Sequence, residues 1–298
     1  MKQFLLSSVL IALCFNNSFL FAQQKTAINK STKPKLVVGI VVDQMRNDYI
    51  YRYWSRYGHG GFKRLVENGY YFKNTHYNYI PTFTGPGHCS IYTGATPRDH
   101  GIIANDWHIK GSKQSSYCVE DSSVQSIGVD NKSGKMSPRK QLSSTIGDEL
   151  KMSTNNKAKV FAVALKDRSA ILPAGHAANA AFWFDDESGN FISSSWYLNQ
   201  LPEWLQNFNA EKKCLSYLSN TWSPLYPLNT YTNSIQDDNS YEAVPNKKQS
   251  STFNYEYKNY VEKKSVGIIK ATPFGNNLTN DLAMACIKNE QLGKDDIC

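Results

Sequence analysis

The chain has 298 residues, of which 41% are hydrophobic and 19% are charged. This balance is typical of a globular protein with a sizeable core and excludes a disordered or fibrous one. The net charge is +8, from 33 basic and 25 acidic residues, and the basic residues form no block of five or six. A modest preference for anionic substrates is compatible with this pattern, and the sequence predicts no nucleic-acid partner.

Residues 1–22 are predicted to be a secretory signal peptide. Lys2 precedes an apolar stretch, and the segment ends at Ala22, a small residue. An uncleaved membrane anchor is the alternative, but polar residues 16–18 interrupt an apolar segment that is already short for a span. No later segment is apolar over enough residues to cross a membrane. We therefore expect a periplasmic or secreted protein, without stable membrane insertion once the signal is removed, and a polar linker at residues 23–34.

Five cysteines follow the predicted signal peptide: Cys89, Cys118, Cys214, Cys286 and Cys298. No two of them have the close spacing of a zinc knuckle or a redox dithiol. In an oxidising compartment one or two disulfides are compatible with the sequence and one thiol has to stay free, but the sequence does not determine the pairing. Cys89 is expected to be buried in a helix and to contribute to packing.

Residues 35–42 form a nearly continuous β-branched run, which predicts a strand buried on both faces of a mostly parallel sheet. Asp43 follows this strand. Ligands bind outside the carboxyl ends of strands in open α/β sheets, so Asp43 is a candidate site residue. Residues 61–69 predict an amphipathic helix that ends at Gly69. A further strand is expected at residues 70–73.

Thr84 lies in a turn that contains two prolines and two glycines. A helix is expected to follow, to continue through residues 90–93 and to end at Gly94. Thr84 would therefore lie at or near the N-cap of this helix. The free amides and the positive dipole end at that point favour an anion, such as an alkoxide or a phosphate. An ordinary N-cap without a catalytic role is the alternative for Thr84.

Two cationic residues follow the next predicted strand. A helix is expected at residues 142–152 and a buried strand at residues 159–165, after which come Lys166 and Arg168. On an extended segment, side chains two residues apart project to the same side, so Lys166 and Arg168 are candidates for binding one dianion together. A solvated turn is the alternative interpretation.

The character of the sequence changes at residues 171–265, which are predicted to be an aromatic-rich cap region inserted into a catalytic α/β domain. The N-terminal part of that domain would cover residues 35–170, and core-like patterning returns at residues 266–298. From residue 171 onward the expected features are a hairpin at 182–192, a short helix at 202–208, a passage of little periodicity at 220–252 and a helix at 278–289.

Several short motifs together resemble the alkaline phosphatase superfamily: Val-Val-Asp43-Gln-Met, Thr-Phe-Thr84-Gly-Pro-Gly-His88, Asn105-Asp-Trp and Lys166-Asp-Arg168. Within it the chain is most similar to the threonine-nucleophile, phosphate-irrepressible alkaline phosphatases. The turn at Thr84 is also shared with nucleotide pyrophosphatase/phosphodiesterases. The resemblance extends from residue 35 to the last residue. It implies an α/β fold with a mixed, mostly parallel sheet flanked by helices.

The resemblance also implies a role for each matched residue. Asp43 would be a zinc ligand, and Thr84, ionised by that zinc, would be the nucleophile that forms a covalent phosphothreonine intermediate. Asn105 would hold one phosphate oxygen, while Lys166 and Arg168 would hold the others. Such a cationic pair is a feature of the monoesterase branch. The expected substrates are therefore small phosphate monoesters, and the expected cofactor of the complete enzyme is two zinc ions.

The zinc ligands are where the chain departs from the family pattern. In the family, most of these ligands come from Asp and His motifs that lie after the segment this chain resembles. None of the six histidines is in a family ligand position. We therefore expect an N-terminal piece of a longer enzyme, inactive by itself, because a catalytic zinc site generally has three protein ligands. An extended chain is expected to bind two zinc ions and to be active.

Two other functions remain as alternatives from the sequence. One is a metal-dependent phosphodiesterase or nucleotide pyrophosphatase, and the other is a non-catalytic binding protein on the same scaffold. Replacing Lys166 or Arg168 would separate the first alternative from a monoesterase. His88 and His100 are expected to be structural residues with satisfied hydrogen bonds. The oligomeric state is not predicted.

Overall fold

The computed structural model describes residues 33–242, 251–262 and 265–295. The chain divides into two units, Met1–Pro34 and Lys35–Cys298. The predicted signal peptide and most of the predicted linker lie outside the described residues. Among the described helices, none is both long and apolar enough to cross a membrane.

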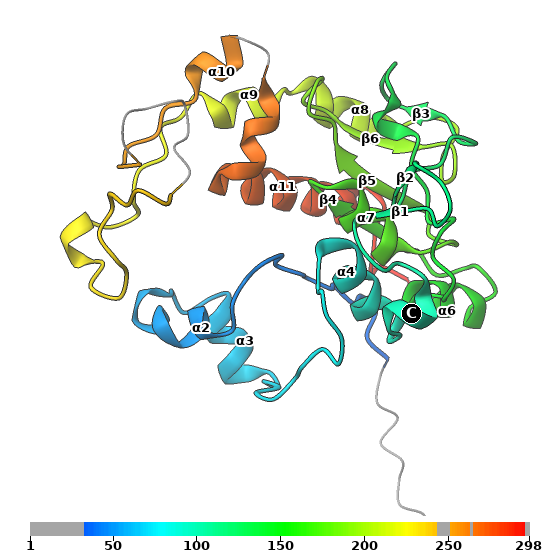
Figure 1. Ribbon diagram of the computed structural model, residues 1–298, viewed down its shortest axis with the longest axis horizontal. Coiled ribbons are helices and arrows are strands. Elements are labelled where there is room, and N and C mark those ends of the chain that lie inside the picture. The colour runs from blue at the N-terminus through cyan, green and yellow to red at the C-terminus, as the bar shows by residue number, and fades with distance from the viewer. Residues whose placement is uncertain (1–32, 243–250, 263–264, 296–298) are drawn as a thin grey trace, which may run out of the picture. The chain divides into compact units, whose positions relative to one another are not determined.

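The larger unit contains, in chain order (Figure 1), α2 (Asp48–Arg52), η2 (Trp54–Arg56), α3 (Phe62–Asn68), α4 (Thr84–Thr93), α5 (Pro97–His100), β1 (Asp106–His108), β2 (Ser115–Tyr117), β3 (Ser126–Ile127), η3 (Lys132–Gly134), α6 (Ile146–Ser153), β4 (Phe161–Ala164), α7 (Asp167–Ala174), β5 (Ala180–Phe184), β6 (Phe191–Ser194), α8 (Glu203–Ala210), α9 (Lys213–Leu218), η4 (Leu228–Thr230), α10 (Lys258–Glu262), η6 (Val266–Ala271) and α11 (Pro273–Asn289).

The main sheet has four strands in the order β3-β6-β5-β4. Strands β4 and β5 are parallel, with Phe161 opposite Ala180, whereas β5 with β6 and β6 with β3 are antiparallel. A separate antiparallel pair, β1 and β2, places Asp106 opposite Tyr117. The predicted α/β class with a mixed sheet flanked by helices is confirmed. The sequence predicts a mostly parallel sheet, but within the described residues only one of its three strand pairings is parallel.

Helices cover both faces of the main sheet because β5 is apolar on both sides. All of its five residues are buried. Phe182 packs in a core with α8, α9, η6 and α11, and the next residue, Trp183, packs in a second core with α4 and α7. Successive side chains of a strand point to opposite faces, so a continuous apolar run joins both layers. Figure 1 shows α11 beside β4 in the first of these layers.

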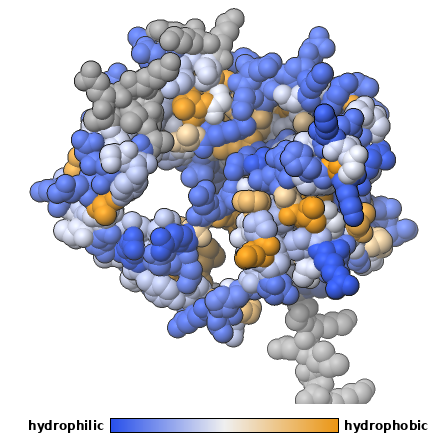
Figure 2. Space-filling view, viewed as in Figure 1, coloured by the Kyte–Doolittle hydropathy of each residue, from blue (hydrophilic) through white to orange (hydrophobic). Residues whose placement is uncertain are grey.

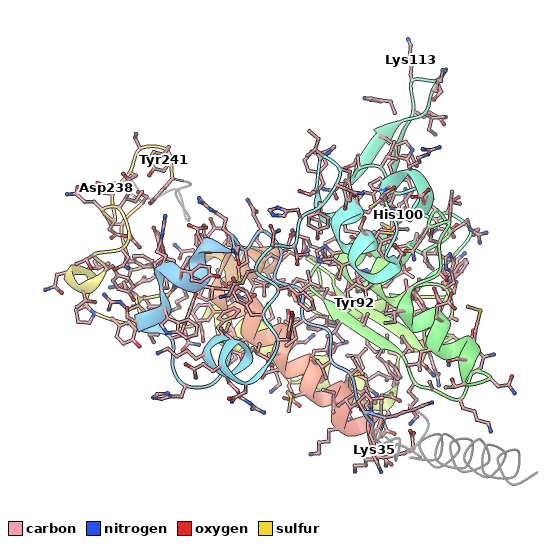
Figure 3. The ribbon with its side chains drawn as sticks, turned by 90° about the horizontal axis from the view of Figure 1, so that it is seen from below. Lys35, Tyr92, His100, Lys113, Asp238 and Tyr241 are labelled. Carbon is pink, nitrogen blue, oxygen red and sulfur yellow. The ribbon has the colours of Figure 1, made fainter. Side chains whose placement is uncertain are left out.

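Residues 35–42 correct the prediction of a buried strand, because they belong to no strand among the described residues. The side chains of Val37 and Ile40 are 71% and 78% exposed. The segment passes Tyr92 of α4 and begins close to the end of α11, where Figure 3 labels Lys35. A β-branched run favours an extended backbone, but its burial requires a neighbouring strand, and the strands of the main sheet do not pair with this segment.

The strand predicted at residues 70–73 is also wrong, since this segment is coil and turn. Tyr70 and Phe72 are exposed, and their rings pack edge to face with centroids 4.7 Å apart. The helix predicted just before it is confirmed by α3, although none of the residues of α3 is buried. This part of the chain therefore carries apolar side chains at its surface. Figure 2 shows several hydrophobic areas on an otherwise mainly hydrophilic face of the molecule.

The helix predicted after the Pro- and Gly-rich turn is confirmed by α4. Thr84 is its first residue and Phe83 occupies the N-cap position. The helix ends where Gly94 adopts a left-handed conformation with φ of 66°, which glycine adopts at no steric cost. Thr84 thus lies at the N-terminal end of a helix, as the sequence predicts.

Helix α6 begins at Ile146, later than the predicted start at residue 142, because Thr145 is its N-cap. In this capping box Thr145 Oγ1 accepts the amide of Asp148, and Asp148 Oδ2 accepts the amide of Thr145 over 2.9 Å. Asp148 Oδ1 also accepts the backbone amides of His176 and Ala177 over 2.9 and 2.7 Å. Burial alone would raise the pKa of Asp148, but its hydrogen bonds lower that pKa to about 2. This carboxylate ties α6 to the turn after α7.

Replacing Gly175 by alanine is expected to lower the free energy of unfolding by about 2–4 kcal/mol. Gly175 has a φ of 75°, and a Cβ there would lie 2.3 Å from Asp148 Oδ2 and 2.5 Å from Thr145 Oγ1. The substitution would strain the backbone and displace the buried carboxylate. Gly111→Ala is the control, because its φ is 80° but nothing lies within 4 Å of the added Cβ. Urea unfolding measures both variants, and equal losses would contradict the importance of the Asp148 contact.

The elements predicted beyond residue 171 are present. The hairpin is formed by β5 and β6, the short helix is α8, and the last helix is α11, which begins earlier than predicted. Of the passage predicted to lack periodicity, residues 243–250 lie outside the described residues, and the described remainder contains the short η4. Because β5 pairs with β4, the main sheet includes residues on both sides of the boundary at residue 171. The division into a catalytic part and an inserted cap stays a prediction.

The four described cysteines, Cys89, Cys118, Cys214 and Cys286, are buried free thiols. Burial raises the pKa of each to about 12. The buried position of Cys89 in α4 confirms its predicted packing role. Cys298 lies outside the described residues.

Candidate active site

Asp43 is the residue at which Thr84 and Lys166 meet. Thr84 Oγ1 donates a hydrogen bond to Asp43 Oδ2 over 3.2 Å, and Lys166 Nζ donates to the same oxygen over 2.7 Å. The side chains of Lys166 and Asp43 are 40% and 37% exposed, so solvent screens this ion pair. Burial alone would raise the pKa of Asp43, but the hydrogen bond and charge of Lys166 outweigh it and lower that pKa. An ionised carboxylate therefore holds the threonine hydroxyl.

Asn105 is fixed against the first turn of α4. Its Oδ1 accepts the backbone amide of Gly85 over 2.7 Å, which satisfies one of the free amides at the start of the helix. A Cβ on Gly85 would lie 3.2 Å from Asn105 Oδ1 and 3.3 Å from Cys118 Sγ, so glycine permits this close approach. Asn105 Nδ2 has no protein partner among the described residues. It is available to an oxygen of a bound anion.

Lys166 and Arg168 lie on a helix start rather than on an extended segment, which corrects the predicted geometry. Lys166 is the N-cap of α7, and Arg168 belongs to the first turn of that helix. The strand before them, β4, ends at Ala164, and Asp167 in the first turn complements the positive end of the helix dipole. The two cations therefore have separate partners, Asp43 for Lys166 and Tyr117 for Arg168.

Tyr117 and Asp167 are neighbours of the site that the sequence does not identify as functional. Arg168 Nη1 donates to Tyr117 Oη over 2.8 Å, and Tyr117 Oη donates to Asp167 Oδ1. Asp167 Oδ1 also accepts the backbone amide of Arg168 over 2.6 Å. Tyr117 comes from β2, which is too short to show a periodicity that would mark it.

The two histidines near α4 are structural, as predicted. His88 Nδ1 is 2.8 Å from the backbone oxygen of Thr84, one turn earlier in the same helix. His100 is fully buried, with Nε2 2.9 Å from Ser90 Oγ and with Nδ1 accepting the amide of Ile102 over 3.1 Å. Burial, as the largest influence, lowers the pKa of both histidines. Both rings are therefore neutral members of the hydrogen-bonded core.

Asp43 and Thr84 fit a hard or borderline metal ion in the kind of atoms they offer but not in number. Both present oxygen to a point beside the helix start. Within the part of the chain that the structure describes, no group of three or more His, Cys, Asp or Glu side chains forms a metal cluster. Three protein ligands are usual for catalytic zinc. Asp43 and Thr84 would therefore need further ligands to hold such an ion.

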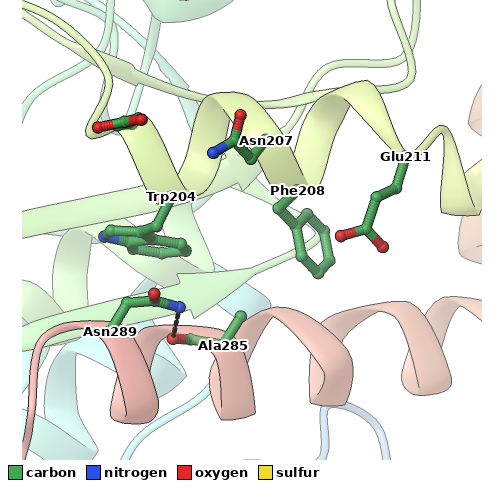
Figure 4. Close-up of a pocket in the computed structure, with 7 residues that line it drawn as sticks. Trp204, Asn207, Phe208, Glu211, Ala285 and Asn289 are labelled. Carbon is green, nitrogen blue, oxygen red and sulfur yellow. Dashed lines mark hydrogen bonds between the residues drawn. The ribbon is translucent and has the colours of Figure 1, made fainter.

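Two cavities in the described part lie away from Thr84. One of about 370 Å³ lies between α8 and α11 and is lined by Trp204, Phe208 and Asn289, among others (Figure 4). The other, of about 500 Å³, is lined by Gly128 and Leu201, among others. None of the predicted site residues lines either cavity. The candidate site around Thr84 is therefore identified from the chemistry of its side chains and not from a deep cavity.

The chain belongs to the type I phosphodiesterase / nucleotide pyrophosphatase family, whose model matches residues 37–265. This range includes all five predicted site residues. It also includes all four strands of the main sheet, β3, β4, β5 and β6, whereas η6 and α11 lie beyond it.

Among individual proteins, the curated relatives include two alkaline phosphatases. PafA of Elizabethkingia meningoseptica is 47% identical over 283 residues, and PhoV of Synechococcus elongatus is 44% identical over 294 residues. A Myroides odoratus protein named calcium-transporting ATPase is 46% identical over 287 residues. The alignments cover 94%, 95% and 96% of this chain and 51%, 53% and 52% of those relatives, respectively. The chain thus spans about half the length of the curated relatives it matches.

Two crystal structures of alkaline phosphatase PafA match the fold. The wild-type structure has a TM-score of 0.86 at 47% sequence identity and covers 89% of this chain and 51% of that chain. The second is a variant in which a threonine, an asparagine, a lysine and an arginine are substituted, and its TM-score is 0.85 at 45% identity, with the same coverage. The predicted resemblance to the alkaline phosphatase fold is confirmed.

Proposed function

We propose that this chain carries the nucleophile and the phosphate-holding residues of an alkaline phosphatase, a zinc-dependent hydrolase of small phosphate monoesters. The observation that carries the proposal is the 3.2 Å hydrogen bond from Thr84 Oγ1, at the start of α4, to a carboxylate that also binds Lys166. Two relatives at 44–47% identity are named alkaline phosphatases, which supports it. Because the chain spans about half their length, the activity is proposed for the whole protein and not for this chain by itself.

Thr84 Oγ1 is the proposed nucleophile. A bond forms between Oγ1 and phosphorus while the bond from phosphorus to the alcohol oxygen breaks. The hydroxyl proton passes to solvent, and the alcohol leaves after it takes up a proton. Water then attacks the phosphothreonine, which releases phosphate and restores the hydroxyl. Phosphoryl transfer depends mainly on in-line positioning and on stabilising charge on the equatorial oxygens, for which Asn105, Lys166 and Arg168 are the proposed donors.

Two zinc ions are the proposed cofactors, with Asp43 and Thr84 as ligands of one of them. A zinc ion at this position would lower the pKa of the threonine hydroxyl, so that the oxygen reacts as an alkoxide. The remaining ligands are expected from the part of the relatives that this chain does not match. The ion pair between Lys166 and Asp43 would then rearrange, because zinc and the ammonium group compete for the same carboxylate.

A phosphodiesterase or nucleotide pyrophosphatase is the second candidate, since the matching family model carries that description. The two cations favour the monoesterase, because a monoester dianion needs more positive charge than a diester monoanion. The four residue types substituted in the PafA variant agree, in kind and order, with Thr84, Asn105, Lys166 and Arg168. This agreement supports the treatment of these four residues as one site.

Export to the periplasm or the medium is also part of the proposal. It is supported by the signal-like composition of residues 1–22. A phosphatase in that location would act on phosphate esters outside the cytoplasm.

The proposed function is tested with a fusion of this chain to the part of the Elizabethkingia relative that it does not match, called here the joined protein. After mixing with an aryl phosphate and quenching in acid, mass spectrometry is expected to find phosphate on the peptide that contains Thr84. Metal analysis is expected to find two zinc ions. The chain alone is expected to show neither, and turnover of the joined protein with phosphate on a different residue would contradict the role of Thr84.

A further inference from the structure

The guanidinium group of Arg168 is held at one side and free at the other. Its Nη1 donates to Tyr117 Oη over 2.8 Å. Its Nε is buried and has no hydrogen-bond partner among the described residues, and no partner is present there for Nη2. Nε and Nη2 together form the side-on fork with which arginine binds two oxygens of a phosphate. A buried N–H without an acceptor is costly, so an acceptor is expected beside Nε.

Tyr117 occupies the one nitrogen that this fork does not use. Its hydroxyl accepts from Arg168 Nη1 and donates to Asp167 Oδ1, so both of its hydrogen-bonding functions are committed. The Arg168 Cζ atom also lies 5.8 Å from the centre of the Tyr117 ring. Burial, as the largest influence, raises the pKa of Tyr117 well above its ordinary value, so the phenol keeps the proton that it donates. The hydroxyl therefore restricts rotation of the guanidinium plane.

The backbone of Tyr117 is fixed from two directions. Its amide donates to Glu120 Oε1 over 3.0 Å, and its carbonyl oxygen accepts from Lys140 Nζ over 2.6 Å. Lys140 and Glu120 also pair with each other over 3.2 Å. The backbone of Tyr117 is therefore held in place by contacts that do not involve Arg168.

The residue that follows β2 is hydrogen-bonded to Asn105. The amide of Cys118, the residue after Tyr117, donates to the backbone oxygen of Asn105 over 2.8 Å. Asp106, the residue after Asn105, lies opposite Tyr117 in the β1–β2 pair. Residues 115–118 thus contact both Asn105 and Arg168, which are two of the three proposed phosphate-oxygen donors.

We infer that Tyr117 is a positioning residue for phosphate binding, which holds the Nε and Nη2 side of Arg168 toward the anion at a fixed distance from Asn105. The inference rests on the proposed function, because it assumes that Arg168 binds phosphate. Tyr117 itself does not touch the substrate. A purely structural role, in which its hydroxyl only stabilises the start of α7, is the competing explanation.

Tyr117→Phe tests the inference, because it keeps the ring and removes the hydroxyl. Isothermal titration of the full chain with inorganic phosphate is expected to show about tenfold weaker binding, as a lost hydrogen bond to a charged group produces. Tyr197→Phe is the matched control. It removes another buried hydroxyl, which donates to the carbonyl of Gly175 at the end of α7 over 3.0 Å, and should leave phosphate binding unchanged. In an Arg168→Ala background, Tyr117→Phe should cause no further loss.

The resonance of Arg168 Nε–H in ¹⁵N NMR gives a second readout that does not depend on phosphate. It is expected to be sharp in the wild type and broadened in Tyr117→Phe, because the guanidinium group then rotates. If Arg168→Ala weakens phosphate binding while Tyr117→Phe retains wild-type affinity and a sharp resonance, the positioning role is overturned and the proposed function stands. If neither variant alters phosphate binding, both the role of Arg168 in the proposed function and the positioning role of Tyr117 are overturned.

Discussion

Replacing Thr84 by alanine is expected to reduce aryl phosphate hydrolysis by the joined protein at least about a thousandfold, because the nucleophile itself is removed. The effect should appear in kcat, since the residues that hold the phosphate oxygens remain. Stability should change little, because the hydroxyl makes one partly exposed hydrogen bond, to Asp43. Initial rates with an aryl phosphate, together with urea unfolding, measure both quantities.

A threonine at the other end of the same helix provides the control for this substitution. Thr93 Oγ1 donates to the backbone oxygen of Cys89 over 2.8 Å, away from Asp43. Thr93→Ala should therefore retain most of the activity. Thr84→Ser keeps a hydroxyl and should retain far more activity than Thr84→Ala. Residual activity of Thr84→Ala above about a tenth of the wild type would rule out Thr84 as the nucleophile.

The substitutions Lys166→Ala and Arg168→Ala should each lower monoester hydrolysis about a hundredfold and leave diester hydrolysis little changed. The cause is charge, because a transferred dianionic group loses one of the two cations that face its oxygens. Lys166→Ala also removes the partner that lowers the pKa of Asp43, so this pKa should rise toward its ordinary value. Steady-state rates with an aryl phosphate and a bis-aryl phosphate measure the two activities in the same preparation.

Lys270→Ala is the control for the loss of a lysine. Lys270 Nζ pairs with Asp186 Oδ1 over 2.6 Å, and neither residue contacts Thr84 or Asp43 in the described part of the chain. The substitution Lys270→Ala removes a similar ion pair and should alter neither monoester nor diester hydrolysis. Equal losses of monoester and diester hydrolysis in Arg168→Ala would indicate damage to the helix start rather than a role in charge recognition. A diester rate that exceeds the monoester rate in the wild type would instead favour the phosphodiesterase.

Local sequence rules account for the positions of Thr84 and Asp43, whereas Asn105 is identified only through the family resemblance. A hydroxyl before a Gly-Pro-Gly turn indicates a helix start, and α4 places Thr84 there. A carboxylate after an apolar run indicates the end of an extended segment, and Asp43 lies within hydrogen-bond distance of Thr84. The contact itself joins residues 41 positions apart and is beyond any local rule.

The fold is predicted well where burial and backbone preference agree and poorly where burial depends on a distant partner. Strand β5 is apolar on every position and is buried on both faces. Residues 35–42 have the same kind of composition but are exposed, because no strand of the main sheet pairs with them. Composition indicates what a strand would bury. It does not identify the neighbour that would cover it.

The conformation at Lys166 and Arg168 illustrates a competition between local signals. The preceding run favours an extended chain, and the alternation of a strand would place both side chains on one side. Asp167 instead begins α7, so each cation reaches a different partner. Tyr117 follows from none of these signals, because its importance arises only from the β1–β2 pairing and from contacts with α7.

The buried cysteines bear on the proposed export. A thiol with a pKa of about 12 is ionised in only about one molecule in a hundred thousand at neutral pH, and the thiolate is the form that exchanges with disulfides. Once folded, Cys89 and Cys118 would thus be slow to form mispaired bridges under oxidising conditions. A chain with several unpaired thiols can in this way enter an oxidising environment, provided that folding outpaces oxidation.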